Sequence, residues 1–139
     1  MRKNKVVGKR GGVTNGMLYV VIILLFAACS TSKVTKPSPI QKIQYGSGGG
    51  FAGNVTTYTL KADGTLWLQE KQIAKLSCDD LSSILELAEQ LPNENYVRPS
   101  NTYYFVQVIL KDTTYYWSWN AGNLPDPKVT ELYIKLNKR

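Results

Sequence analysis

An unbroken apolar run near the N-terminus separates a leader from the part of the chain that can fold. Met17–Ala28 holds twelve consecutive apolar residues and follows a polar, basic segment. As a helix this run would measure about 18 Å, whereas the hydrocarbon core of a bilayer is about 30 Å thick, so a permanent transmembrane span is not expected. A basic segment followed by a short apolar run is typical of a secretory signal peptide. We therefore expect residues 1–28 to be a signal peptide.

The residues that close this run resemble the lipobox of bacterial lipoproteins. Ala27–Ala28 directly precede Cys29, and Phe26 takes the place of the usual aliphatic residue. In lipoproteins the cysteine sulfur is acylated, palmitate being one such acyl group, and the cysteine becomes the new N-terminus. The resemblance implies lipidation of Cys29, a membrane anchor without a spanning helix, and a place in the bacterial cell envelope. Ser30 in place of Asp favours the outer membrane. Ordinary cleavage and secretion is the alternative.

The remaining chain is expected to form a flexible tether, residues 29–40, and one small domain, residues 41–139. Of the seventeen Lys and Arg residues, five precede Cys29, where no acid occurs, so twelve basic residues remain against ten acidic ones. A nearly neutral domain lacks the basic surface that binds the phosphates of a nucleic acid, so no nucleic acid partner is expected.

The absence of histidine excludes most familiar enzyme classes. The chain contains no His, so Ser-His-Asp and Cys-His nucleophile systems and histidine metal sites cannot form. The carboxylates are dispersed, which favours neither acid–base catalysis nor a calcium cage. We expect no enzyme activity, no metal and no cofactor. With Cys29 acylated, Cys78 has no partner for an internal disulfide, and we expect it to be a partly buried apolar residue.

Alternating apolar residues and turn signals predict the strands. Ala62–Asp63–Gly64 indicates the turn of a first hairpin and Lys111–Thr114 that of a second. Between Glu70 and Lys75 the sequence indicates only a polar, hairpin-like stretch, and residues 93–102 show no periodicity. The predicted strands are Gln41–Tyr45, Val55–Leu60, Leu66–Glu70, Tyr103–Leu110 and Tyr115–Trp119.

Capping signals predict two helices. Ser77 can cap a helix whose apolar residues recur at three- and four-residue spacing until Pro92 stops it. Asp126 followed by Pro127 marks the start of a second, C-terminal helix. The order strand pair, helix, strand pair, helix predicts an α+β fold with an antiparallel sheet of about four strands and two helices on one face.

Aromatic residues concentrate in the second hairpin. Tyr115, Trp117 and Trp119 fall on one face of its return strand. Such rings either belong to the core or form an exposed aromatic surface that binds a glycan or a protein.

A glycine-rich segment follows the first predicted strand. Gly46–Gly53 contains five glycines in eight positions around one large side chain, Phe51. Glycine permits positive φ and close backbone approach, so we expect a tight loop or a bulge. Phe51 is then either packed into the core or presented on an exposed binding loop. No Gly-Lys-Ser/Thr follows, as a phosphate loop would require, and the nucleophile elbow of a hydrolase would lack its base.

The same segment resembles the opening of the emfourin family, small protein inhibitors of protealysin and related thermolysin-like metallopeptidases. That family begins with a comparable Gly-Gly-Phe-Ala-Gly, and its later elements follow a similar order, so the resemblance covers about Ile43 to Leu136. It implies a non-catalytic, protein-binding domain that occludes a peptidase cleft. The residues of the motif, and of a binding loop if there is one, are Gly48, Gly49, Gly50, Phe51, Ala52 and Gly53.

A second resemblance leaves an alternative open. The glycine motif together with Tyr58-x-Leu60 and Asp63–Gly64 is similar to a pattern in small bacterial outer-membrane lipoproteins. This alternative is an envelope lipoprotein with a structural or glycan-binding role. Glycan binding would require Trp117 and Trp119 to be exposed.

Overall fold

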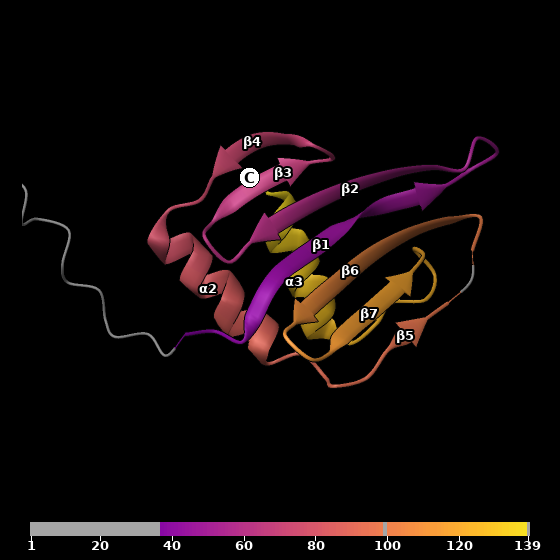
Figure 1. The fold of residues 1–139 in the computed structure, drawn as a ribbon. Coiled ribbons are helices and arrows are strands. Elements are labelled where there is room, and N and C mark those ends of the chain that lie inside the picture. The colour runs from indigo at the N-terminus through magenta and orange to yellow at the C-terminus, as the bar shows by residue number, and fades with distance from the viewer. Residues whose placement is uncertain (1–36, 99, 139) are drawn as a thin grey trace, which may run out of the picture. The chain divides into compact units, whose positions relative to one another are not determined.

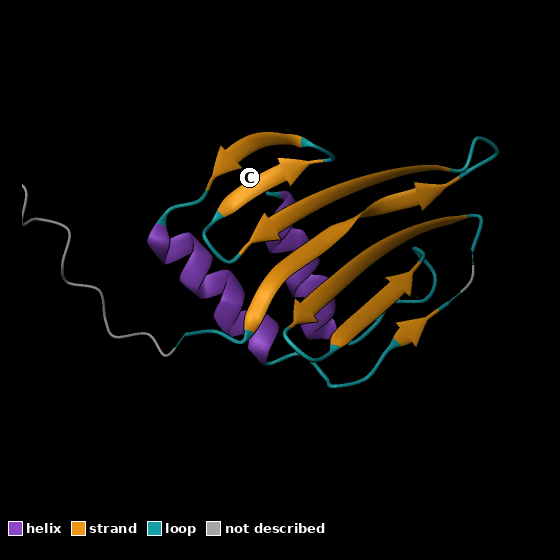
Figure 2. Cartoon of the chain, viewed as in Figure 1, coloured by secondary structure: helices purple, strands orange, loops and turns teal. Residues whose placement is uncertain are grey.

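The computed structural model describes residues 37–98 and 100–138, which belong to one compact unit, Pro37–Arg139, with its own hydrophobic core. The predicted signal peptide, Cys29 and most of the predicted tether lie outside the described residues. Both helices of this unit lie behind a single broad sheet (Figures 1 and 2).

The sheet has seven strands in the order β4-β3-β2-β1-β6-β7-β5. Neighbouring strands pair antiparallel except β5 and β7, which pair parallel. The strands are β1 (Ile40–Gly49), β2 (Asn54–Lys61), β3 (Thr65–Leu68), β4 (Lys71–Lys75), β5 (Tyr96–Val97), β6 (Thr102–Leu110) and β7 (Thr114–Trp119).

The predicted antiparallel sheet of about four strands is therefore wrong. The described residues form one mixed sheet of seven strands. The polar stretch Lys71–Lys75 is the edge strand β4, and all five of its residues are exposed. Tyr96–Val97 forms the other edge as a two-residue strand beside β7. An exposed edge strand needs no apolar alternation, and two residues are too few to show any, so neither strand left a pattern in the sequence.

The first strand is also longer than predicted, because it continues through the glycines to Gly49. Gly46 pairs with Thr57 on one side and Phe105 on the other. A Cβ atom at Gly46 would overlap the carbonyl oxygen of Thr56. Glycine at this position therefore allows β1 to lie this close to β2. The first half of the glycine-rich segment, Gly46–Gly49, belongs to the strand.

Both helices begin at the predicted caps. In α2 (Cys78–Glu89) the Ser77 hydroxyl accepts a hydrogen bond from the Asp80 backbone N–H at 3.2 Å. In α3 (Pro127–Asn137) the Asp126 carboxylate accepts one from the Lys128 N–H at 2.8 Å. Each cap satisfies a backbone donor that the first helical turn leaves unpaired. Cys78 is free and exposed, so the expectation of partial burial is wrong.

The core lies between the helices and the sheet. The helices contact each other, and α3 also contacts β6. The tether end of the unit is held to α2, since the Ser38 hydroxyl donates a hydrogen bond to the Glu89 carboxylate at 2.6 Å. The largest side chains with less than 2% exposure are Trp117, Ile43, Leu60, Ile84, Leu132, Val106 and Val129.

Candidate functional site

The most conspicuous surface feature is the tip of the β1–β2 hairpin. Figure 1 shows this hairpin running away from the helices to one end of the sheet, with the tip residues Gly50–Gly53 between the two strands. The Phe51 side chain has a relative exposure of 116%, and Val55 next to the tip is 47% exposed. The interpretation that packs Phe51 into the core is therefore wrong, and the exposed-loop interpretation describes its position.

Two backbone hydrogen bonds hold the tip, one to the residue before β6 and one within the turn. The Gly50 N–H donates to the Asn101 carbonyl at 2.6 Å, which joins the tip to the start of β6, and the Gly53 N–H donates to the Gly50 carbonyl at 3.1 Å. Gly50 and Gly53 have φ values of +79° and +62°, which residues with a Cβ rarely adopt. The chain thus presents Phe51 on a turn whose conformation is set by glycine and by backbone hydrogen bonds.

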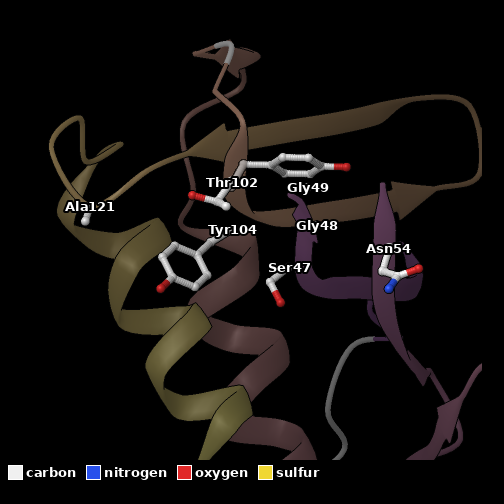
Figure 3. Close-up of a pocket in the computed structure, with 8 residues that line it drawn as sticks. Ser47, Gly48, Gly49, Asn54, Thr102, Tyr104 and Ala121 are labelled. Carbon is white, nitrogen blue, oxygen red and sulfur yellow. The ribbon is translucent and has the colours of Figure 1, made fainter. Parts of the chain in front are cut away.

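A pocket of about 330 Å³ lies at the root of the tip (Figure 3). Its lining comes from β1, β2, the start of β6 and the loop after β7, and consists of Ser47, Gly48, Gly49, Asn54, Thr102, Tyr103, Tyr104 and Ala121. None of these residues is charged. The pocket therefore offers neutral hydroxyl and amide groups beside the aromatic rings of Tyr103 and Tyr104.

Strand register explains how the pocket forms. Gly49 pairs with Asn54 on one side and Thr102 on the other, so a row across three strands has no side chain at its centre. Two residues earlier on β1, and so on the same face of the sheet, Ser47 is another small residue and pairs with Tyr104. The Tyr104 ring packs against the rings of Trp119 and Tyr133, with centroids 6.2 and 5.6 Å apart. The aromatic wall of the pocket is therefore held in place by the core.

The predicted aromatic surface on β7 is not exposed. Trp117 and Trp119 have relative exposures of 1% and 3%, and Tyr115 is half-buried. The interpretation of these three rings as a flat binding surface is therefore wrong, because Trp117 and Trp119 belong to the buried core and Tyr115 packs against it. The structure does not bring them to the hairpin tip.

The sequence did not single out Trp67 on β3, whose ring is held by a hydrogen bond and by a contact with a lysine. Its Nε1–H donates to the Thr65 hydroxyl at 3.0 Å, and the Lys61 ammonium lies 4.1 Å from its ring centroid. The Thr65 hydroxyl in turn donates to the Asp63 carboxylate at 2.6 Å. A Trp two residues after an Asp-Gly-Thr turn was the available signal. The cluster orders the β2–β3 turn and lies away from the residues of the tip pocket.

The pKa values of Asp63 and Tyr133 are shifted by their surroundings. The hydrogen bonds from the Thr65 hydroxyl and backbone N–H lower the pKa of the Asp63 carboxyl below its ordinary value of 3.8. Burial raises the pKa of the Tyr133 phenol above its ordinary value of 10.0. Asp63 belongs to a turn, and Tyr133 packs beneath the pocket wall, so both shifts accompany structural roles.

In the part of the chain that the structure describes, no three His, Cys, Asp or Glu side chains come together as a metal site. Within the same residues, no helix is long and apolar enough to cross a membrane.

Comparison with protein-family models finds no match to this chain, and comparison with curated protein sequences finds none either.

Proposed function

We propose that this protein is an envelope lipoprotein, anchored to the outer membrane through Cys29, whose domain binds another protein without catalysing a reaction. The tip of the β1–β2 hairpin makes the contact, and a thermolysin-like metallopeptidase is the partner that the resemblance of residues 48–53 favours. The observation that carries the proposal is the full exposure of Phe51 on a glycine turn.

An exposed phenylalanine on a fixed turn supports binding in two ways. Burying a Phe side chain against a partner contributes about 2–3 kcal/mol, and aromatic residues are common energetic centres of protein interfaces. The hydrogen bonds at Gly50 and Gly53 already set the shape of the turn. Little conformational entropy is therefore lost on binding, as is expected for a segment that enters a peptidase cleft.

The glycan-binding alternative loses its specific support. It required an exposed platform of Trp117 and Trp119, and both side chains are buried. A structural role in the envelope is left as the competing explanation, and it requires no contact at Phe51.

Inhibition of a thermolysin-like metallopeptidase tests the proposal. The inhibitor is the soluble chain Ser30–Arg139, which contains the whole compact unit, and it is compared with Phe51→Ala. Val97→Ala is the control, because Val97 is 56% exposed on the edge strand β5, three strands away from β1 and outside the β1–β2 hairpin. We expect Phe51→Ala to raise the inhibition constant about 30-fold or more, from the burial estimate above, and Val97→Ala to leave it unchanged.

Circular dichroism shows whether each variant is folded. A folded wild-type chain that does not inhibit the peptidase would exclude this class of partner. Equal inhibition by wild type and Phe51→Ala would show that the hairpin tip does not contact the peptidase.

A further inference from the structure

The outer edge of β2 is open next to the hairpin tip. Strand β3 pairs with β2 only over Tyr58–Leu60, whereas β2 begins at Asn54 and pairs with β1 along its other side as far as the tip. Among the described residues, no strand lies beside residues 54–57 on the outer side. Figure 1 shows this half of β2 extending beyond β3 and β4. The sheet therefore has an open edge at residues 54–57, and this edge leads to the tip.

The alternation of backbone hydrogen bonds shows which groups face the open edge. Successive residues of an antiparallel strand direct their N–H and C=O groups to opposite neighbours. The Ala62 N–H, just after β2, donates to the Gln41 carbonyl of β1 at 3.1 Å. The Gln69 N–H donates to the Thr57 carbonyl at 3.3 Å, on the outer side of β2. Val55 lies two residues before Thr57, so it directs both its N–H and its C=O toward the open edge, where no described strand pairs with it.

The two end strands of the sheet have features that hinder the addition of another strand. Strand β4 begins at Lys71 and ends at Lys75, and its register with β3 shifts between Leu66 and Trp67. Strand β5 is only two residues long. Lysines, irregular register and short length are means by which sheet edges avoid pairing with other chains. The open edge at residues 54–57 has no charged residue and no register shift.

The chemistry of the open edge selects an extended polypeptide segment. The N–H and C=O groups of an edge strand are paired by the backbone of an added strand. Three of the four residues 54–57 are β-branched and none is charged, which favours uncharged, strand-forming side chains in the segment opposite. A segment paired with Val55 also continues past the turn that carries Phe51. The same segment can therefore contact both the open edge and the hairpin tip.

We propose that an extended, uncharged segment of the partner peptidase pairs with residues 54–57 as an additional strand of the sheet. This inference rests on the proposed function and adds a backbone contact to the contact made by the Phe51 ring. Val55 provides one hydrogen-bond donor and one acceptor for the segment.

Amide hydrogen exchange in the complex tests the pairing. The soluble chain Ser30–Arg139, which contains the whole compact unit, is bound to a catalytically inactive thermolysin-like metallopeptidase. Exchange is quenched after set times and measured for single residues by mass spectrometry. We expect the exchange of the Val55 amide to slow about 10-fold or more on binding, because its N–H gains an acceptor. The amides of Lys71–Lys75 at the end of the sheet should keep their rates.

Two substitutions at Val55 isolate the backbone donor. Val55→Pro removes the outward N–H, at an edge position where proline is tolerated. Val55→Ala shortens the side chain but keeps the N–H, so it is the matched control. We expect the inhibition constant of Val55→Pro to be about 10-fold higher than that of Val55→Ala, from the loss of one hydrogen bond. Circular dichroism shows whether both variants are folded, and the exchange of the wild-type chain decides the question if Val55→Pro is not.

The outcomes distinguish this inference from the proposed function. Inhibition that requires Phe51 but leaves Val55 exchange unchanged would overturn the strand pairing alone. Slowed Val55 exchange together with full inhibition by Phe51→Ala would support the pairing and overturn the tip contact. Slow, concentration-dependent exchange of Val55 in the chain without peptidase would show that a second copy occupies the edge, which would overturn the inference. If no complex forms, both the proposed function and the inference are wrong.

Discussion

Gly46 is the residue whose identity the sheet restricts most directly. It is buried between β2 and β6, and a Cβ atom there would overlap the Thr56 carbonyl oxygen. Gly46→Ala should lower the free energy of unfolding by about 2–3 kcal/mol, because two backbones would have to separate in the middle of the sheet. Urea denaturation followed by circular dichroism measures this loss.

Gly53→Ala is the matched control for that substitution. Gly53 has φ +62°, and nothing lies within 4 Å of its ideal Cβ position. The expected loss is only about 1 kcal/mol, from the left-handed backbone conformation. Equal losses at the two positions would show that steric overlap is not what requires glycine at Gly46.

The Asp63 carboxyl provides a prediction about pH. Its pKa is lowered mainly by the hydrogen bond from the Thr65 hydroxyl. The folded state therefore binds this proton more weakly than the unfolded state does, so the stabilisation is present above the unfolded pKa and is lost as pH falls through the folded pKa. Thr65→Val should move the carboxyl ¹³C titration of Asp63 upward toward 3.8. An unchanged titration midpoint would contradict the assigned cause.

At the scale of the elements, the cap of α2 gives a separate prediction. The Ser77 hydroxyl accepts from the Asp80 N–H, so Ser77→Ala should destabilise the domain by about 1 kcal/mol. Ser82→Ala is the control, since that hydroxyl only donates to Glu86 one turn along the same helix, and it should change stability by less than about 0.5 kcal/mol. The measurement is a pair of urea denaturation curves, and the expectation fails if Ser82→Ala costs as much as Ser77→Ala.

The elements with capping residues or a long run of strand-favouring residues could be predicted, and the edge strands could not. Ser77 and Asp126 mark both helix starts because side-chain acceptors pair with the first backbone donors. The long strand β6 is marked by its aromatic and β-branched residues, of which Phe105 and Val106, neighbours in the chain, are both buried. The edge strands β4 and β5 carry no burial pattern, and the glycines of β1 have no side chains to alternate, so the width of the sheet was not visible in the sequence.

The sequence indicated which segment forms the candidate site but not how the side chains of that segment are arranged. The glycine motif indicated the right segment, yet one Phe among glycines can point into the core or into solvent, and only the hairpin geometry places Phe51 outside. The pocket beside it depends on the register that aligns Gly49 with Asn54 and Thr102. Register across three strands is a tertiary property that no local pattern contains.

For the whole molecule, the sequence outside the described residues predicts a lipid anchor at Cys29. The mature protein should begin at Cys29 and carry the added mass of its acyl chains. Intact-mass spectrometry of protein extracted from membranes measures this, and Cys29→Ala should abolish both the added mass and the partitioning into detergent. A mature chain without an acyl mass at Cys29 would leave secretion as the alternative.

The proposed contact between the hairpin tip and a protein partner can be tested by photocrosslinking. A photoreactive phenylalanine analogue replaces Phe51 in the anchored protein in its own envelope. A second chain carries the analogue at Val97 on the edge strand β5, three strands away from β1. We expect a discrete covalent adduct with another protein from position 51 and none from position 97. No protein adduct from position 51, or the same adducts from both positions, would contradict it.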